Sequence, residues 1–225
     1  MDLERNNETT YINRLPIDKF SRMLDDPTQC YKFYWFEAIM ILFQSSKDDL
    51  LFDDIFNEMI YAAWNSVTKF HLSLGPKVNG APVNLLERAI HIIENNSKTS
   101  LLTDKHSIIE AIKRNETKLI DCKKSLAKNV PYRLLSSCME EIGGNDEIWD
   151  HKEALIQYIG ELNNSISLPY IIVDGKGYKK KVRINPQWRQ YLIDNYPIIT
   201  SWIRLKKIQF LQDRNPDVHG IVYKL

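Results

Sequence analysis

The residues most able to do chemistry are basic, and they gather in the last quarter of the chain. Residues 169–225 contain eleven lysines and arginines against four acidic residues, which gives this part a net charge of +7. A phosphate-binding surface needs several cations close together, because each neutralised phosphate releases condensed counterions and adds affinity. The pattern predicts contact with nucleic-acid phosphate or with an acidic partner. The candidate nucleic-acid-binding residues are Lys176, Tyr178, Lys179, Lys180, Lys181, Arg183, Arg204, Lys206, Lys207 and Arg214.

The spacing of three of these cations supports the same prediction. Lys179, Lys181 and Arg183 stand at alternate positions of an expected strand, and alternate side chains of a strand point to one face. Tyr178 lies among them and offers a ring on which a base can stack. The charges also have an ordinary structural use, since lysines on an exposed strand keep it from pairing with other strands. The sequence leaves both interpretations open.

Catalytic chemistry has little support in the sequence. The five histidines form no HExxH or other metal-ligand spacing, and the three cysteines contain no CxxC pair. Asp174 and Lys176 come nearest to a metal-dependent nuclease, but no second acidic residue accompanies them. The Asp-His-Lys-Glu segment at 150–153 falls on an expected helix, where neighbouring side chains point to different faces. We therefore expect no catalytic residue, metal ligand or cofactor from any motif in this chain, which leaves an enzyme with an unrecognised site open.

Composition and hydropathy place the chain among globular proteins. Hydrophobic residues make up 44% and charged residues 26% of the 225 positions, a balance typical of a packed domain. The first ten residues lack a basic region followed by an apolar run, so we expect no signal peptide. The most apolar stretch, residues 31–43, contains Lys32 and Glu37 and is shorter than the roughly 20 residues that cross a bilayer. These features predict a cytoplasmic protein without a membrane partner.

Helical periodicity dominates the first three quarters of the chain. Between residues 52 and 70, apolar side chains recur at steps of three and four, which places them on one face of a helix. Asp104 is a typical N-cap, and a glycine pair at 143–144 is a typical C-cap. The sequence predicts a mainly α fold, a multi-helix bundle, with a loop at residues 75–82. The expected helices cover residues 16–24, 31–45, 52–70, 86–93, 104–112, 117–128, 132–142 and 146–162.

The pattern changes after residue 168. Residues 169–173 and 179–184 read as two short strands, and the segment 174–178 between them contains two glycines suited to a hairpin turn. Asn185 followed by Pro186 predicts a helix start, and helices are expected over 186–195 and 197–212. We predict a helical body at residues 1–168 and, at 169–225, a basic β-hairpin with two helices that packs on the body as one unit. The body carries a net charge of −6.

Four segments together resemble the helical front portion of bacterial HNH-endonuclease-domain proteins, in an order that runs through nearly the whole chain. In proteins of that kind, a ββα-metal nuclease motif follows the segment that corresponds to residues 215–225. No histidine of this chain can be assigned to the general base of that motif, and the tripeptide Ser136–Cys138 stands where a proline-containing segment is expected. The four segments are Cys30–Trp35, Met59–Trp64 with Leu72–Gly75, Val130–Leu135 and Phe210–Leu225.

The resemblance implies a non-catalytic module of an HNH-type nuclease that binds and positions DNA or docks a regulator, in a bacterial defence or mobile-element system. A divalent metal would enter only with a nuclease module elsewhere. The alternative is a protein-interaction or inhibitor subunit without nucleic-acid contact. In that case the apolar residues Ile221, Val222 and Leu225 would be exposed and would bind a protein partner or a second copy. This apolar ending also predicts either a continuation beyond Leu225 or a partner that covers it.

Overall fold

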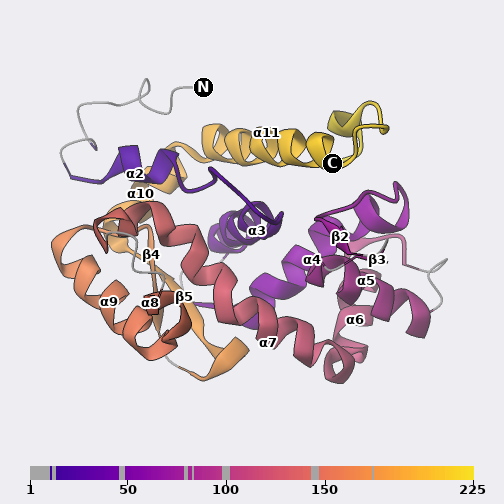
Figure 1. Ribbon diagram of the computed structural model, residues 1–225, viewed down its shortest axis with the longest axis horizontal. Helices are drawn as coiled ribbons and strands as arrows, with labels where there is room; N and C mark the ends of the chain where they lie inside the picture. The colour runs from indigo at the N-terminus through magenta and orange to yellow at the C-terminus, as the bar shows by residue number, and fades with distance from the viewer. Residues whose placement is uncertain are drawn as a thin grey trace.

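The fold is predominantly helical with a small antiparallel sheet, as the sequence predicted (Figure 1). The computed structural model describes residues 11, 14–45, 49–78, 81–82, 84–97, 102–142, 147–173 and 175–225. The caps expected at residues 143–146 and the candidate nuclease residue Asp174 lie outside these ranges.

Helix α3 (Tyr31–Ser45) occupies the centre of the molecule in Figure 1, between α11 (Tyr196–Arg214), α4 (Phe52–Thr68) and α7 (Glu116–Arg133). Its four consecutive aromatic residues, from Phe33 to Phe36, are all buried. Trp35 packs against the rings of Phe52 and Phe56, with ring centroids 5.1 and 5.3 Å apart. A helix that is apolar on all sides needs neighbours on all sides, so this composition fixes its central place.

Helices α5 (Leu85–Asn96) and α6 (Lys105–Arg114) pack beside α4. The carboxylate of Asp104 accepts a hydrogen bond from the Ser107 amide at 3.0 Å, which confirms the predicted N-cap of α6. The predicted loop at residues 75–82 contains two short strands, β2 (Lys77–Val78) and β3 (Ala81–Pro82), which pair with each other. Strands of two residues are too short for a periodicity of two to reveal them.

The helices after residue 115 differ from the prediction in their boundaries. One helix, α7, covers the break expected after residue 128 and includes Pro131, and the 3₁₀ helix η2 (Leu134–Ile142) follows it. Proline removes only one helical hydrogen bond when it lies in the last turn, so it does not end α7 earlier. The helix expected over 146–162 is two helices, α8 (Glu147–Asp150) and α9 (Lys152–Ser165), with His151 between them.

The C-terminal part contains the predicted hairpin of β4 (Tyr170–Val173) and β5 (Lys181–Ile184). A third strand, β1 (Leu50–Leu51), pairs with the other side of β5 and gives the order β1-β5-β4. The turn contains the 3₁₀ helix η3 (Gly177–Lys179). Helix α10 (Pro186–Asp194) begins after Asn185, whose side chain caps it as predicted.

Helix α2 (Ile17–Ser21) joins these elements through one aromatic cluster. The ring of Phe20 contacts those of Trp188 on α10, Trp202 on α11 and Phe36 on α3. The buried apolar residues of 15–168 and 169–225 form one continuous core. The chain then passes from α11 to a last 3₁₀ turn, η4 (Ile221–Tyr223).

Candidate nucleic-acid interface

Three of the predicted cations lie in the turn between β4 and β5 and at the first residue of β5. Lys176 and Lys179 are exposed and Lys181 is half-buried, and the side-chain ammonium of none of these three lysines makes a hydrogen bond or ion pair with another described residue. We call them the turn lysines. Gly175 has a φ of +88°, and a Cβ at this position would clash with the carbonyl oxygen of Lys179. Glycine at 175 is therefore needed for this turn to form.

Two expectations about the hairpin need correction. Lys179 lies in the 3₁₀ turn η3 and not on the strand, so only Lys181 and Arg183 share a face of β5. The opposite face carries Val182 and Ile184, which are buried. Strand β5 is also the central strand, because β1 and β4 pair with its two edges. The basic residues of β5 therefore do not protect an open edge from pairing.

Arg183 is bound within the protein. Its guanidinium donates two hydrogen bonds of 2.8 Å to the carboxylate of Asp49, just before β1. These bonds hold the pKa of Asp49 below its ordinary value. The ion pair thus fastens the hairpin to the helical body, and it competes with any phosphate for this arginine.

We predict that Asp49→Asn lowers the free energy of unfolding by less than about 1 kcal/mol at neutral pH, since Arg183 is half-exposed. The pKa of Asp49 is lowered in the folded state, so the carboxylate contributes stability above the ordinary aspartate value of about 4. That contribution is lost as the pH falls through the lowered folded-state pKa. Urea unfolding of both proteins from pH 7 down to pH 3 measures it. A difference that grows towards acid pH would contradict this account.

Lys180 is also held by the body. Its ammonium donates a 2.9 Å hydrogen bond to the hydroxyl of Tyr132 near the end of α7, and lies 5.6 Å from the centre of that ring. Burial lowers the pKa of Lys180. This lysine therefore positions the hairpin against α7 and differs from the turn lysines on either side.

Two of the predicted cations on α11 have acidic partners from the body. Lys207 is buried and donates a 2.6 Å hydrogen bond to the carboxylate of Glu37 on α3, with its ammonium 4.8 Å from the ring centre of Tyr34. Lys206 donates a 2.7 Å hydrogen bond to Asp25 in the loop before α3. Both charges bind α11 to the central helix and its preceding loop.

The other two predicted cations on α11 also have neighbours within the protein: Arg204 binds the last residues of the chain, and Arg214 lies over an aromatic ring. Arg204 donates hydrogen bonds of 3.1 Å to the carbonyl oxygens of Val222 and Leu225. The guanidinium of Arg214 lies 5.3 Å from the centre of the Phe210 ring. The ten predicted residues thus fall into two groups, one on the hairpin and one on α11, and most of their charges are engaged inside the molecule.

A groove of about 450 Å³ lies beside the turn. Tyr178 and Lys179 line one side of it, and Tyr178 is half-buried against the core. The opposite side comes from the helical body. The residues that line the groove are Leu51, Asp53, Lys113, Glu116, Tyr178 and Lys179.

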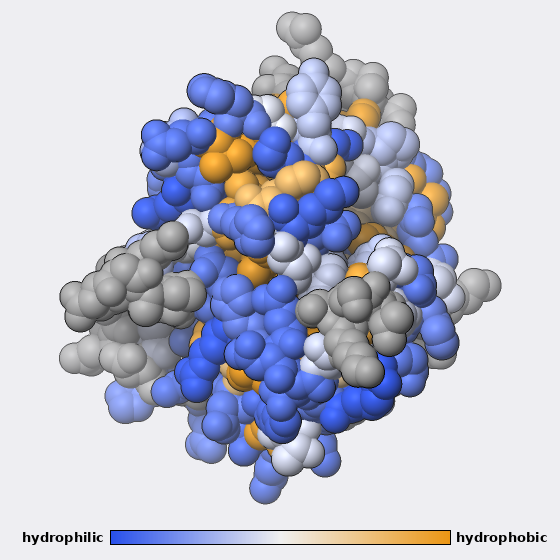
Figure 2. Space-filling model, turned by 90° about the vertical axis from the view of Figure 1, so that its right-hand side faces the viewer, coloured by the Kyte–Doolittle hydropathy of each residue, from blue (hydrophilic) through white to orange (hydrophobic). Residues whose placement is uncertain are grey.

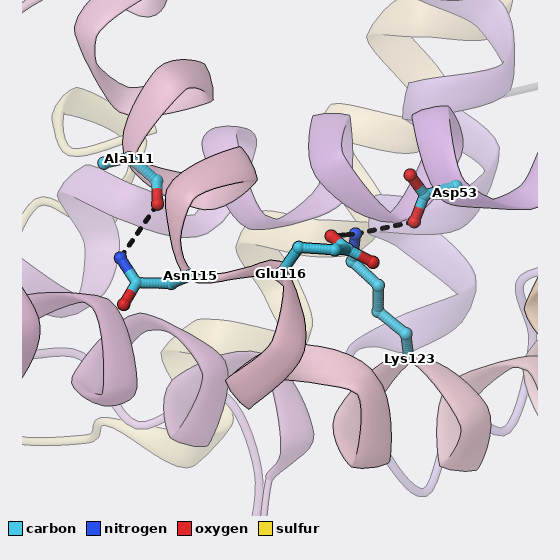
Figure 3. Close-up of polar contacts among 5 residues, drawn as sticks. All are labelled: Asp53, Ala111, Asn115, Glu116 and Lys123. Atoms are coloured by element: carbon cyan, nitrogen blue, oxygen red, sulfur yellow. Dashed lines mark hydrogen bonds and ion pairs between the residues drawn. The ribbon is translucent and has the colours of Figure 1, made fainter.

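The two acidic residues of the groove bind a lysine that the sequence analysis missed. Lys123 on α7 is fully buried, and its ammonium contacts the carboxylates of Glu116 in the first turn of α7 and Asp53 in the first turn of α4, the latter at 2.6 Å (Figure 3). Because both acids lie in the first turn of a helix, each also interacts favourably with the positive end of its helix dipole. Burial and the charge of Asp53 raise the pKa of the neighbouring Asp54. We call Asp53, Glu116 and Lys123 the buried ion cluster.

The buried ion cluster positions the groove and does not offer an open metal site. Figure 3 shows Lys123 reaching between α4 and α7, with its ammonium placed between the two carboxylates. Asn115, at the junction of α6 and α7, donates a 2.9 Å hydrogen bond to the carbonyl of Ala111 and fixes the bend between these helices. Within the described ranges, no three histidine, cysteine or acidic side chains lie close enough to hold a metal ion.

No protein-family profile, curated protein or solved structure matches the chain. In the part of the chain that the structure describes, no helix has both the length and the apolar character needed to cross a membrane.

Proposed function

We propose that this chain binds nucleic-acid phosphate through the turn lysines, as a non-catalytic DNA-binding and positioning or regulatory module. The proposal rests on a contrast between two sets of cations. The ammonium groups of Lys176, Lys179 and Lys181 make no hydrogen bond or ion pair with a described residue, whereas the cations around them do. A cation that is already bound to a carboxylate must break that ion pair to bind phosphate. These three lysines have no such ion pair to break. Tyr178 lies within the same turn, where its ring is half-exposed.

The biological setting of the proposal comes from the resemblance to HNH-endonuclease-domain proteins. It assigns the module to an HNH-type nuclease of a bacterial defence or mobile-element system, working in the cytoplasm. The nuclease chemistry, with its divalent metal, would then be supplied by a module outside this chain. In this proposal, the hairpin binds the DNA backbone and the other module performs the nuclease chemistry.

We predict that exchanging all three turn lysines for glutamate weakens binding to duplex DNA at least about tenfold at moderate salt, because reversed charges repel phosphate. A matched control exchanges Lys69, Lys124 and Lys128, three exposed lysines elsewhere, for glutamate and changes the net charge equally. Fluorescence anisotropy with a labelled duplex measures both. Equal weakening in the two triple variants would show that only net charge matters, and unchanged binding in the first would remove the proposal.

A protein partner at the C-terminal end is the second candidate. Leu205 on α11 and Val222 and Tyr223 on η4 are exposed, the last by 89%. Figure 2 shows an apolar patch in the upper part of this side of the molecule, at the height of α11 in Figure 1. This candidate requires Ile221, Val222 and Leu225 to be exposed; Val222 is exposed, but Leu225 is half-buried and Ile221 packs into the core and is only 1% exposed. Absence of DNA binding would favour this candidate.

A further inference from the structure

The groove beside the turn borders directly on the turn lysines. Lys179, one of the three, lines the groove itself. Lys181 stands directly opposite Leu51 in the antiparallel pairing of β5 with β1, and Leu51 also lines the groove. Side chains at directly opposed positions lie on the same face of a sheet, with their Cβ atoms about 5 Å apart. A phosphate bound by Lys179 and Lys181 therefore lies at the rim of the groove.

The groove offers an aromatic ring and an aliphatic side chain to a nucleobase. Tyr178 is half-buried, because it packs against the core and also lines the groove. The 3₁₀ turn η3, which carries Tyr178, packs against α4 and α7, and this packing holds the ring in place. Leu51 is apolar and yet 39% exposed. Aromatic side chains stack on unpaired bases of any sequence, since every base has a π-face.

The groove also contains hydrogen-bond acceptors that solvent can reach. Lys123 binds Oδ1 of Asp53 and Oε2 of Glu116. The second oxygen of each carboxylate makes no hydrogen bond to a described residue, and the two side chains are 34% and 35% exposed. Carboxylates accept hydrogen bonds from the amino group of cytosine. These oxygens can therefore bind the edge of a base while the buried ion cluster holds them in position.

The acids of the groove do not exclude a nucleotide. Both carboxylates share the positive charge of Lys123, and Lys179 adds a second positive charge at the same groove. Two negative and two positive charges therefore balance. Lys113 also lines the groove, but its charge is engaged by Glu110, with 3.0 Å between the charged atoms. A balanced groove beside the turn lysines suits a nucleotide, because its phosphate is charged and its base is not.

We propose, on the basis of the function proposed above, that the groove binds one unpaired base of single-stranded DNA while the turn lysines bind the adjoining phosphates. The base stacks on Tyr178. Bases within a duplex are stacked and paired, so only an unpaired base can enter the groove. A base with an amino group, such as cytosine, is preferred because Asp53 and Glu116 accept hydrogen bonds from it. The groove, at about 450 Å³, lies within the roughly 300–1,000 Å³ of small-molecule sites.

Fluorescence anisotropy with labelled single strands of equal length tests this proposal. An abasic strand keeps the phosphates and lacks the bases, so it should bind at least about fivefold more weakly than oligo(dC), the lower limit for stacking on an aromatic ring. Oligo(dT) should bind about tenfold more weakly than oligo(dC), because thymine has a carbonyl oxygen in place of the amino group and a hydrogen bond to a charged group is lost. Equal affinities for oligo(dC) and either of the other strands would overturn the proposal.

Tyr178→Ala should weaken binding of oligo(dC) at least about fivefold and leave binding of the abasic strand and of a duplex unchanged. Tyr178→Phe keeps the ring and should bind oligo(dC) as the unmodified chain does. Tyr223→Ala, which removes an exposed tyrosine elsewhere, is the matched control and should also bind normally. Equal weakening for all three nucleic acids in Tyr178→Ala would contradict stacking. The comparison of strands needs no substitution, so it decides the question even if Tyr178→Ala does not fold.

The two proposals fail in different ways. If the turn lysines bind phosphate but the groove binds no base, oligo(dC) and the abasic strand bind equally well, and both lose affinity when the turn lysines are exchanged for glutamate. If the turn lysines do not bind phosphate, that exchange leaves the affinity for the abasic strand and for the duplex unchanged. Both proposals hold if the exchange weakens all three nucleic acids and Tyr178→Ala weakens only oligo(dC).

Discussion

Replacing Lys123 by methionine is expected to lower the free energy of unfolding by about 3–5 kcal/mol. Lys123 is fully buried, and its ammonium is the cation that Asp53 and Glu116 share. Methionine fills a similar volume but leaves two carboxylates facing each other without a counter-charge. Because each carboxylate is about one-third exposed, water recovers part of the loss, and we expect a value near the lower end.

The neighbouring residue supplies the control for this prediction. Lys124 is exposed on the same helix, and Lys124→Met should change stability by no more than about 0.5 kcal/mol. Adding Asp53→Asn and Glu116→Gln to Lys123→Met should restore at least about half of the loss, because the uncompensated charges are removed. Urea unfolding of the four proteins measures this. Equal stabilities of the two single lysine variants would mean that the buried ion cluster contributes nothing.

Replacing Phe20 by alanine should cost about 3–5 kcal/mol, the usual loss for a large aromatic side chain removed from a core. Phe20 is fully buried, and its ring centroid lies 4.9 Å from that of Trp188 and 5.8 Å from those of Tyr191 and Trp202. The side chain therefore holds α2 against α10 and α11. Tyr223→Ala, at a position that is 89% exposed, is the comparison and should have little effect.

The same variant tests whether residues before and after position 168 unfold together. Tryptophan fluorescence reports on the aromatic cluster, and far-ultraviolet circular dichroism reports on the helices of the whole chain. Since the core is continuous, both signals should shift to lower urea by the same amount. Two separate transitions in Phe20→Ala would contradict a single cooperative unit.

Most of the helices were predictable because their signals are local. The apolar stripe of α4 recurs within three or four positions, and the caps Asp104 and Asn185 stand next to the helices that they start. Local patterns also predicted β4 and β5. Strand β1 was not predictable, because two residues at the start of a helix become a strand only through pairing with β5, far along the chain.

The candidate interface was less predictable, because the sequence shows charges and not their partners. Arg183 and Asp49 are 134 positions apart, and Lys207 and Glu37 are 170 positions apart. Lys123 stands beside Lys124 in the sequence and has the same side chain, yet one is buried and the other exposed. The count of basic residues predicted a polarised chain, whereas only the fold distinguishes cations that bind the protein from those that face solvent.

The salt dependence of DNA binding tests the central proposal most directly. The affinity of the unmodified chain for duplex DNA, measured over a series of salt concentrations, should fall with a slope of about −2.7 in log–log form, about −0.9 for each of three phosphate contacts. Exchange of the three turn lysines for glutamate should remove most of that slope. An affinity that does not respond to salt, or a slope that is the same in both proteins, would contradict phosphate binding by this turn.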